Sequence, residues 1–336
     1  MRVLMTTDSV GGVWTYCLEM VRALREIGIE TSVATMGAKL TGQQVGEMIF
    51  AGADPLFESE FKLEWMASPW DDLAAAGEWL LDVERQVRPD VVHLNSYVHG
   101  TLPWAAPTVM VGHSCVLSWW RAVRSEEAPP EWQRYRDEVR AGLQAADFVA
   151  APTRAMLHSL RTTYGPLEHS ATIHNCRDSS RFVASNGGPR IFAMGRLWDP
   201  AKNLAALDEI APQLAWPVRV AGSCVHPDSG ESVAARNVTM LGSLSQPQVA
   251  RELSDAAIYA LPARYEPFGL SILEAALSGC ALVVGDIPSL RELWDGVAWF
   301  VAPDSPDALT DALQRLIDDE PLRAASAEAA LARART

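Results

Sequence analysis

Short apolar runs alternate with segments of helical periodicity through the first half of the chain. Residues 2–8 (RVLMTTD) have the pattern of a buried strand, and apolar side chains then recur at helical spacing from Trp14 to Ile27. The next strand-like runs are IETSVATM, VVHLN, PTVMVGH and DFVAAP, and Thr153 is placed to cap a helix that continues to Tyr164. Short β-rich runs between helices predict a parallel sheet with helices on both faces.

The alternation stops at a polar segment and then begins again. Residues 180–190 (SRFVASNGGPR) contain Gly-Gly-Pro and are typical of a linker. After it the pattern predicts strands over IFAMGR, VRVAG, VTMLGS, AIYALPA and ALVVGD, and helices near Asn203–Leu214 and Gln246–Ala256. We therefore expect two α/β domains, residues 1–183 and 184–336, with a ligand cleft between the carboxyl ends of their sheets.

The amino-acid composition limits the kinds of molecule that the protein is expected to bind. The 336 residues include 28 Lys and Arg against 42 Asp and Glu, a net charge of −14, so neither nucleic acid nor an anionic membrane is an expected partner. Five scattered cysteines without a C-x-x-C pair indicate reduced thiols. The sequence has no apolar run of about 18 residues, and its start, MRVLMTTD, enters a strand-like run directly. These features predict a cytoplasmic protein without a transmembrane segment, and they do not indicate an oligomeric state.

The common nucleotide-binding motifs are absent. The first predicted strand is followed by SVGG rather than by G-x-G-x-x-G, and the chain contains no Walker lysine motif. NAD-binding and P-loop functions therefore lose their main support in the sequence.

Two glutamates flank a glycine in RYEPFGLSILEAALSGCALVV, residues 264–284. Glu266 falls in the loop after a predicted strand, Gly269 removes the Cβ where a short helix starts, and Glu274 lies in the first turns of that helix. The N–H groups from Gly269 to Ile272 are expected to be free and to bind an anion. A diphosphate would fit there, with sugar hydroxyls at the two carboxylates. The alternative is a surface glutamate plus a glutamate that only favours the helix.

An ordered set of segments resembles a known family. They are SVGGVWTYCLEMVRAL, RPDVVHLN, VMVGHS, APTRAM, TIHNCRDSSRF, FAMGRLWDPAKN and EPFGLSILEAALSGCALVV. In this order they are similar to the motifs of retaining glycosyltransferases of family 4, and they cover nearly the whole chain. The resemblance implies the GT-B fold, an α/β architecture of two Rossmann-like domains that face each other across a cleft.

The resemblance also implies a role for each matching residue. Glu266 would bind the donor sugar, and Glu274 would bind the nucleotide ribose. Arg196 and Lys202 would neutralise the departing diphosphate, on which charge builds as the bond breaks; outside this pattern they would be ordinary surface charges. The residues that would line the diphosphate and sugar are Phe268, Gly269, Leu270 and Ser271, with Gly11 and Gly12 as a second backbone anion site or simply a tight turn.

Further candidates lie in the first half of the chain. His113 ends the run PTVMVGH and is expected at the mouth of the cleft, where similar enzymes have a histidine near the reacting carbon. His93 is interpreted as a packed strand residue, whereas Asn95 is a candidate to face the cleft. The acceptor candidates are Trp119, Trp120 and Arg121, together with Asn95, because aromatic rings stack on sugars and guanidinium groups bind anions; for the tryptophans a buried aromatic cluster is the alternative.

The implied reaction is transfer of a hexose from a nucleotide sugar to a hydroxyl acceptor with retention at the anomeric carbon. UDP-glucose is weakly favoured as donor over GDP-mannose and UDP-N-acetylglucosamine, and the acceptor is a sugar, a glycolipid or a small molecule. The resemblance implies that neither a metal nor another cofactor is required, and no D-x-D motif of the metal-dependent kind is evident. A nucleotide-sugar epimerase of the same fold and a non-catalytic sugar-nucleotide binding protein remain the alternatives.

Some positions depart from the family pattern. His174 and Cys176 stand beside Asn175 where relatives often have proline and glycine, and IPSLRELW replaces a Gly-Gly segment. The details of the contacts to donor hydroxyls therefore stay open. The chain ends at ALARART, where relatives usually continue into a helix that crosses back to the first domain, so this crossing helix is expected to be missing.

Overall fold

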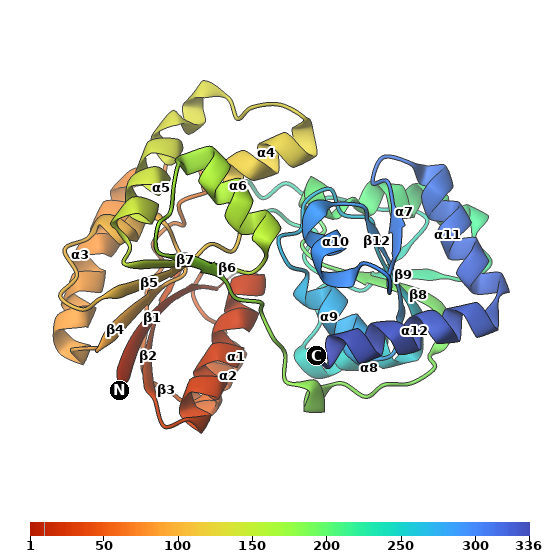
Figure 1. Ribbon diagram of the computed structural model, residues 1–336, viewed down its shortest axis with the longest axis horizontal. Helices are drawn as coiled ribbons and strands as arrows, with labels where there is room; N and C mark the ends of the chain where they lie inside the picture. The colour runs from red at the N-terminus through yellow and green to blue at the C-terminus, as the bar shows by residue number, and fades with distance from the viewer. Residues whose placement is uncertain (10) are drawn as a thin grey trace. The chain divides into compact units, whose positions relative to one another are not determined.

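The protein is described by a computed structural model over residues 1–9 and 11–336, which divide into two compact units. Unit 1 is Met1–Cys176 and unit 2 is Arg177–Thr336. The domain boundary expected from the sequence, between residues 183 and 184, falls inside unit 2. Figure 1 shows the strands and helices of each unit.

Unit 1 contains a parallel sheet of seven strands in the order β3-β2-β1-β4-β5-β6-β7. Strand β1 pairs with β2 from Arg2 opposite Glu30 to Asp8 opposite Met36. The apolar runs at residues 2–8, 29–36, 91–95, 107–113 and 147–152 thus predicted five of these strands correctly. The strands are β1 Arg2–Asp8, β2 Glu30–Met36, β3 Ala53–Glu58, β4 Val91–Leu94, β5 Thr108–Val111, β6 Phe148–Ala151 and β7 Ser170–Thr172.

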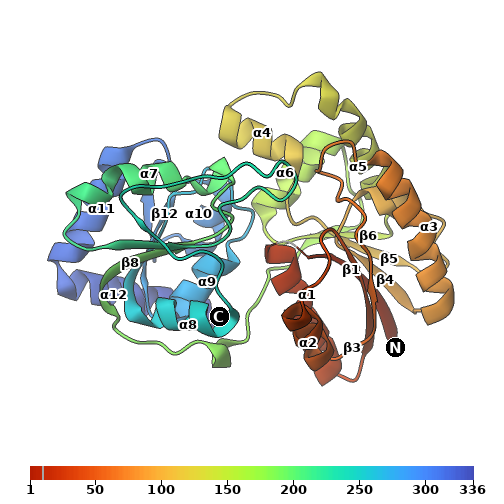
Figure 2. The ribbon, with the colours of Figure 1, turned by 180° about the vertical axis from the view of Figure 1, so that it is seen from behind.

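Helices cover both faces of this sheet (Figures 1 and 2). Val3 and Met5 of β1 pack with the helices α1 and α2, whereas Leu4 between them packs with α3, so alternate residues of one strand enter two cores. Thr153 caps α6 by accepting a hydrogen bond from the N–H of Met156, as its sequence position predicts. The helices are α1 Gly12–Glu26, α2 Gly42–Ala51, α3 Trp70–Val87, α4 Val116–Arg124, α5 Gln133–Ala145 and α6 Arg154–Tyr164, with 3₁₀ turns η1 Val98–Thr101 and η2 Pro130–Trp132.

Unit 2 contains a second parallel sheet, of six strands, in the order β10-β9-β8-β11-β12-β13. Two strands are buried along their whole length, because both faces of the sheet are covered. The strands are β8 Gly188–Met194, β9 Val218–Ala221, β10 Thr239–Met240, β11 Ala256–Leu261, β12 Ala281–Gly285 and β13 Trp299–Val301.

The helices of unit 2 lie in two layers. Ile258 and Ala260 of β11 pack with α7 and α11, whereas Tyr259 and Leu261 pack with α8, α9, α10 and α12. The C-terminal helix α12 thus belongs to the core of unit 2. The helices are α7 Leu204–Ile210, α8 Gln246–Asp255, α9 Leu270–Leu277, α10 Pro288–Trp294, α11 Pro306–Asp318 and α12 Glu320–Ala334, with 3₁₀ turns η3 Ser179–Arg181, η4 Pro200–Lys202 and η5 Ala211–Gln213.

Two predicted elements of unit 2 are shorter in the structure. The helix expected to reach Leu214 ends at Ile210 and continues only as the 3₁₀ turn η5. Pro212 explains this end, because proline has no N–H and its ring collides with the carbonyl of the preceding turn. The run VTMLGS forms a strand only at Thr239 and Met240. Within residues 1–9 and 11–336, no helix is both long enough and apolar enough to cross a bilayer.

Candidate functional site

The predicted donor residues of unit 2 follow two neighbouring strands of its sheet. Lys202 lies in the connection after β8, and Glu266 lies in the connection after β11. Because the two strands are parallel, both connections begin at the same edge. The Lys202 ammonium contacts the Glu266 carboxylate, with 2.6 Å between Nζ and Oε2. Their side chains are 11% and 14% exposed, so this pair is largely withdrawn from water.

The turn that carries Lys202 is fixed by its own backbone. We call residues 199–203 the Lys202 turn. Asp199 caps it, because its Oδ1 accepts the N–H of Ala201 at 2.9 Å. Asn203 adopts a left-handed conformation with φ of 58°, and its amide donates to the carbonyls of Pro262 at 3.0 Å and Pro303 at 2.7 Å. These bonds tie the turn to the connections that follow β11 and β13.

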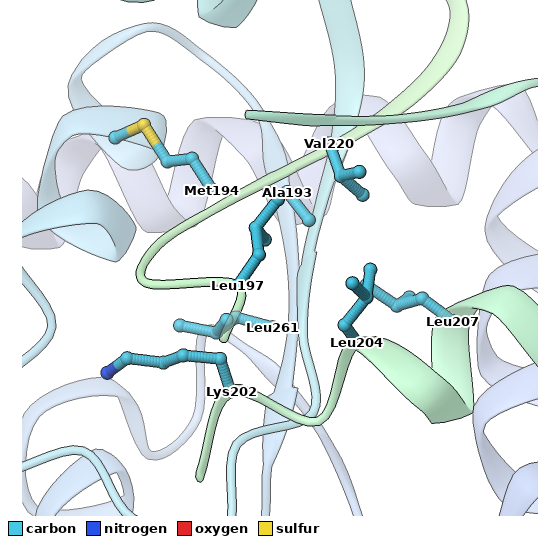
Figure 3. A pocket seen from close by; sticks show the side chains of 8 residues that line it. All are labelled: Ala193, Met194, Leu197, Lys202, Leu204, Leu207, Val220 and Leu261. Carbon is cyan, nitrogen blue, oxygen red and sulfur yellow. The ribbon is translucent and has the colours of Figure 1, made fainter. Parts of the chain in front are cut away.

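An apolar wall supports the stem of Lys202. A Cβ at Gly195 would lie 3.3 Å from the Cγ of Lys202, so the absence of a side chain lets the stem lie against the main chain. Figure 3 shows Lys202 beside Leu197 and Leu261, with its nitrogen at the end away from Val220. The cavity at this wall is only about 10 Å³, room for roughly one water molecule. It therefore supports the lysine and does not hold a sugar.

Gly269 sets the start of α9 beside Glu266. Its φ is 88°, a conformation that favours glycine, and an added Cβ would lie 2.8 Å from Cδ1 of Ile272 and 3.4 Å from Cγ of Glu266. One expectation is corrected here. The N–H of Ile272 is not free, because it donates to the carbonyl of Gly269 at 3.0 Å. Within residues 1–9 and 11–336, the N–H groups of Gly269, Leu270 and Ser271 meet no acceptor, so these three remain the donors for an anion.

Arg196 is more exposed than Lys202. Its side chain is 36% exposed and its guanidinium donates to the carboxylate of Asp199 at 3.1 Å. It also lies over the ring of Trp198, 5.4 Å from the centroid. Asp199 therefore serves both cationic positions: one oxygen caps the Lys202 turn and the other pairs with Arg196.

Glu274 has an ion-pair partner that the sequence did not indicate. Its carboxylate is buried and lies 2.7 Å from Nε of Arg177, measured to Oε1. Arg177 is the first residue of unit 2 and follows the exposed Cys176. Arg177 lies within the motif segment TIHNCRDSSRF, but the resemblance assigned it no role, and an arginine in a polar segment is usually exposed.

A polar cluster occupies the carboxyl edge of the sheet in unit 1. The amide nitrogen of Asn95 donates to the carbonyl of Thr6 at 2.7 Å, so its oxygen faces His113. That oxygen lies 2.7 Å from Nε2 of His113 and can only accept. The proton of the neutral ring therefore lies on Nε2, and Nδ1 is the acceptor. The ring edge of Tyr16 packs against His113, with 4.7 Å between centroids.

Both histidines of this cluster are held neutral. Desolvation, together with the smaller effect of the neighbouring His93, lowers the pKa of His113 to about 3. Burial alone lowers the pKa of His93 to about 4, and its Nε2 lies 3.3 Å from the hydroxyl of Tyr16. His93 is thus the packed strand residue that its pattern indicated. His113 lies beyond β5, which ends at Val111, and not at the strand end as expected.

The other candidates of unit 1 divide into two groups. Gly11 has φ of 78° and immediately precedes α1, and both Gly11 and Gly12 are exposed. On α4, the rings of Trp119 and Trp120 contact each other edge to face. The guanidinium of Arg121 binds both oxygens of Glu127, at 2.7 and 3.0 Å, and the hydroxyl of Thr163 at 2.9 Å. Each of the three guanidinium nitrogens of Arg121 therefore already donates a hydrogen bond within the protein.

Metal ligands do not converge in the described part of the chain. Over residues 1–9 and 11–336, no group of three or more His, Cys, Asp or Glu side chains is arranged to hold a metal ion. Independence from metal stays a prediction.

Two family models match the chain in succession. Glycosyltransferase Family 4 matches residues 10–181, which is more than half of the chain, and Glycosyl transferases group 1 matches residues 188–319. The chain belongs to glycosyltransferase family 4. The resemblance inferred from the motifs is thereby confirmed.

Individual relatives of this family 4 protein are distant. It is 34% identical over 109 residues to alpha-D-kanosaminyltransferase of Streptomyces kanamyceticus, a match that spans 30% of this chain and 28% of the relative. It is 29% identical over 147 residues to phosphatidyl-myo-inositol mannosyltransferase of Mycolicibacterium smegmatis, a match that spans 41% of this chain and 38% of the relative. The matched part is thus well under half of either relative.

Solved structures confirm the predicted GT-B fold. Sucrose-phosphate synthase from Thermosynechococcus elongatus superposes with a TM-score of 0.81 at 17% identity, over 100% of this chain and 94% of that one. Anabaena HepE in complex with UDP-glucose superposes with a TM-score of 0.77 at 17% identity, over 99% of this chain and 94% of that one. At 17% identity, this similarity shows a shared fold and nothing further.

Proposed function

We propose that this protein transfers a hexose from a nucleoside diphosphate sugar to a hydroxyl acceptor, with retention at the anomeric carbon. The observation that carries the proposal is the contact between Lys202 and Glu266 at the start of α9, because it sets a cation and a carboxylate beside three unused N–H groups. Membership of family 4 supports the reaction class. UDP-glucose is the favoured donor, since HepE of the same fold binds it.

In the proposed reaction, the residues of unit 2 hold the donor. The diphosphate accepts from the N–H groups of Leu270 and Ser271 and is neutralised by Lys202 and Arg196. An ammonium has three donors, so Lys202 can keep one on Glu266 while another reaches the phosphate. Glu266 accepts from the sugar hydroxyls. The acceptor oxygen attacks the anomeric carbon, the bond to the diphosphate breaks, and the departing oxygen takes the acceptor's proton.

The roles of the remaining residues stay proposals of the same kind. Glu274 binds the ribose and Phe268 lines the donor position. In unit 1, His113, Gly11 and Gly12 are proposed to contact the donor, and His113 can act only as a neutral group, since its pKa is held near 3. Trp119 and Trp120 are proposed to contact the acceptor. Glu127 and Thr163 already bind Arg121, so an acceptor contact by this residue would have to replace one of these bonds.

A donor panel tests the proposal. The protein is incubated with UDP-glucose, GDP-mannose or UDP-N-acetylglucosamine and a set of hydroxyl acceptors, in chelator, and release of the nucleoside diphosphate is followed. We expect acceptor-dependent release that survives the chelator, with a product whose anomeric proton shows the donor's configuration. Epimerised donor without acceptor identifies an epimerase, and binding without turnover identifies a binding protein; either result overturns the proposal.

A further inference from the structure

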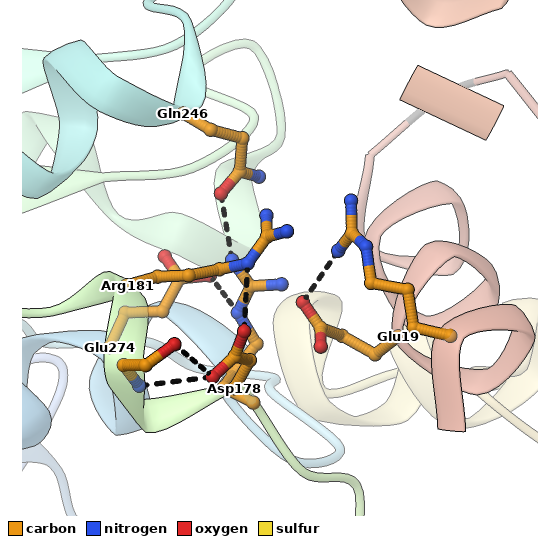
Figure 4. A network of polar contacts seen from close by, with 8 residues as sticks. Glu19, Asp178, Arg181, Gln246 and Glu274 are labelled. Carbon is orange, nitrogen blue, oxygen red and sulfur yellow. Dashed lines mark hydrogen bonds and ion pairs between the residues drawn. The ribbon is translucent and has the colours of Figure 1, made fainter. Parts of the chain in front are cut away.

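The ion pair between Arg177 and Glu274 is among the most deeply buried polar contacts of unit 2. The side chains are 1% and 6% exposed, and 2.7 Å separates Nε from Oε1. The same guanidinium donates from NH2 to the side-chain oxygen of Gln246 at 2.7 Å and lies 5.4 Å from the ring centroid of Phe182. Figure 4 shows Gln246 and Glu274 within this network of polar contacts. The guanidinium of Arg177 therefore contacts a residue of α8, a residue of α9, and Phe182 in the segment that follows Arg177.

Burial of this kind is poor evidence for a role in stability alone. Removing two charges from water costs about as much as their attraction returns, so a pair of packed apolar side chains would serve the core equally well. An ion pair at this position needs another explanation. What it does provide is a carboxylate that is ionised and held in one orientation by a rigid planar partner.

The position of Glu274 on α9 explains why an oriented carboxylate would be useful there. Ser271 and Glu274 are three residues apart, so they lie on neighbouring positions of one helix face. A diphosphate at the N–H of Ser271 would therefore have its attached ribose about one helical turn, roughly 5 Å, farther along the same face. The carboxylate fixed by Arg177 lies at that level of the helix.

We propose that Arg177 is a positioning residue for the nucleotide ribose: it holds the Glu274 carboxylate ionised and oriented so that ribose hydroxyls can donate to it. This inference rests on the proposed function, because it requires a nucleoside diphosphate at α9. It assigns a task to a side chain that touches Glu274 and not the reacting atoms. The selectivity it provides is for a nucleotide with ribose hydroxyls over one without them.

The test measures how much the ribose hydroxyls add to binding. Calorimetry compares UDP and GDP with their 2′,3′-dideoxy counterparts and with inorganic pyrophosphate. For the wild-type protein, we expect the better nucleotide to bind about tenfold or more tightly than its dideoxy form, as for hydrogen bonds to a charged group. In Arg177→Met this preference should be lost, while the affinity for pyrophosphate stays within about twofold. Arg177→Lys, which keeps the charge without the fork, should restore part of the preference.

Matched variants separate this inference from the proposed function. Glu274→Gln should lose the ribose preference in the same way, whereas Arg181→Met, which removes a partly exposed arginine paired with Asp178 a few residues away, should behave as wild type. If Glu274→Gln loses the preference and Arg177→Met keeps it, the role of Arg177 is wrong and the proposed site stands. If wild type shows no preference, or Glu274→Gln retains it, the ribose role fails for both.

Folding of the variants is checked by thermal unfolding. Arg177→Met leaves a buried carboxylate without its partner, so it should unfold at lower temperature than the double variant Arg177→Met/Glu274→Gln, which removes that charge as well. Should Arg177→Met not fold, Arg177→Gln takes its place with the same expected loss of preference. A ribose preference that persists in Arg177→Gln overturns the inference.

Discussion

Replacing Lys202 by methionine tests the proposed leaving-group cation most directly. Methionine keeps an unbranched stem that can lie over Gly195 and against Leu261, so the apolar contacts of the stem are largely retained. What is lost is the ammonium, and with it the contact of 2.6 Å to Glu266. The variant therefore removes charge at nearly constant shape.

Two effects of different size should follow. Glu266 is 14% exposed in its side chain, so its carboxylate loses a charged partner in a poorly hydrated place, and the free energy of unfolding should fall by about 1–3 kcal/mol. Catalysis should suffer more, because a fixed charge at a developing anion is worth about 10²–10³ in kcat. Lys202→Arg should retain a larger share of activity, since it keeps a cation on the same turn.

The assay measures kcat/KM from release of the nucleoside diphosphate, and urea unfolding of the same preparations reports stability. Lys39→Met is the matched control, because Lys39 is exposed in unit 1 and should change neither quantity. A folded Lys202→Met protein with kcat/KM within about threefold of wild type would show that the cation does not assist the leaving group. Equal losses in Lys202→Met and Lys39→Met would point instead to a nonspecific effect of net charge.

Three further changes probe other parts of the structure. Asn95→Ala removes the acceptor that keeps the proton on Nε2 of His113, so donor turnover should fall about tenfold or more, and the desolvated N–H left without an acceptor should lower the free energy of unfolding by about 1–3 kcal/mol; unchanged turnover would remove His113 from the site. Gly269→Ala forces a Cβ into a left-handed turn and should cost about 1–2 kcal/mol of stability together with donor affinity; an unchanged affinity for pyrophosphate would contradict the anion site. Burial raises the pKa of Glu64 to about 7, so the folded state holds this proton more tightly than the unfolded chain and the resulting stabilisation is lost between about pH 4.5 and 7. Glu64→Gln should accordingly gain up to about 3 kcal/mol relative to wild type between pH 5 and 8 in urea titrations, and a pH-independent difference would refute the shift.

The sequence predicted those features that depend on local pattern. Strands such as β11 and β12 are continuous apolar runs, and buried parallel strands produce that pattern directly. The cap at Thr153 and the turn at Gly269 were predictable because each follows from the chemistry of one residue. The motif order identified the family before the fold was known.

Other features depend on contacts between distant segments, and no local pattern reports them. The burial of Arg177 arises from Gln246 and Glu274, which lie far along the chain. The partners of Arg121 belong to a loop and to α6, so its surface-like sequence did not indicate that it was already bound. At Ile272 the N–H was expected to be free, but a positive φ at Gly269 turns a carbonyl toward it, a detail of backbone geometry that composition does not encode.

The Lys202 turn has a thermodynamic consequence for whatever binds there. Asp199 and Asn203 hold it through hydrogen bonds to main-chain groups, so its shape does not depend on a ligand. A ligand that meets a turn already in its final form loses none of its binding energy to freezing flexible backbone. Because folding has already fixed the Lys202 turn, a ligand binds to it more tightly than it would to a flexible turn with the same groups.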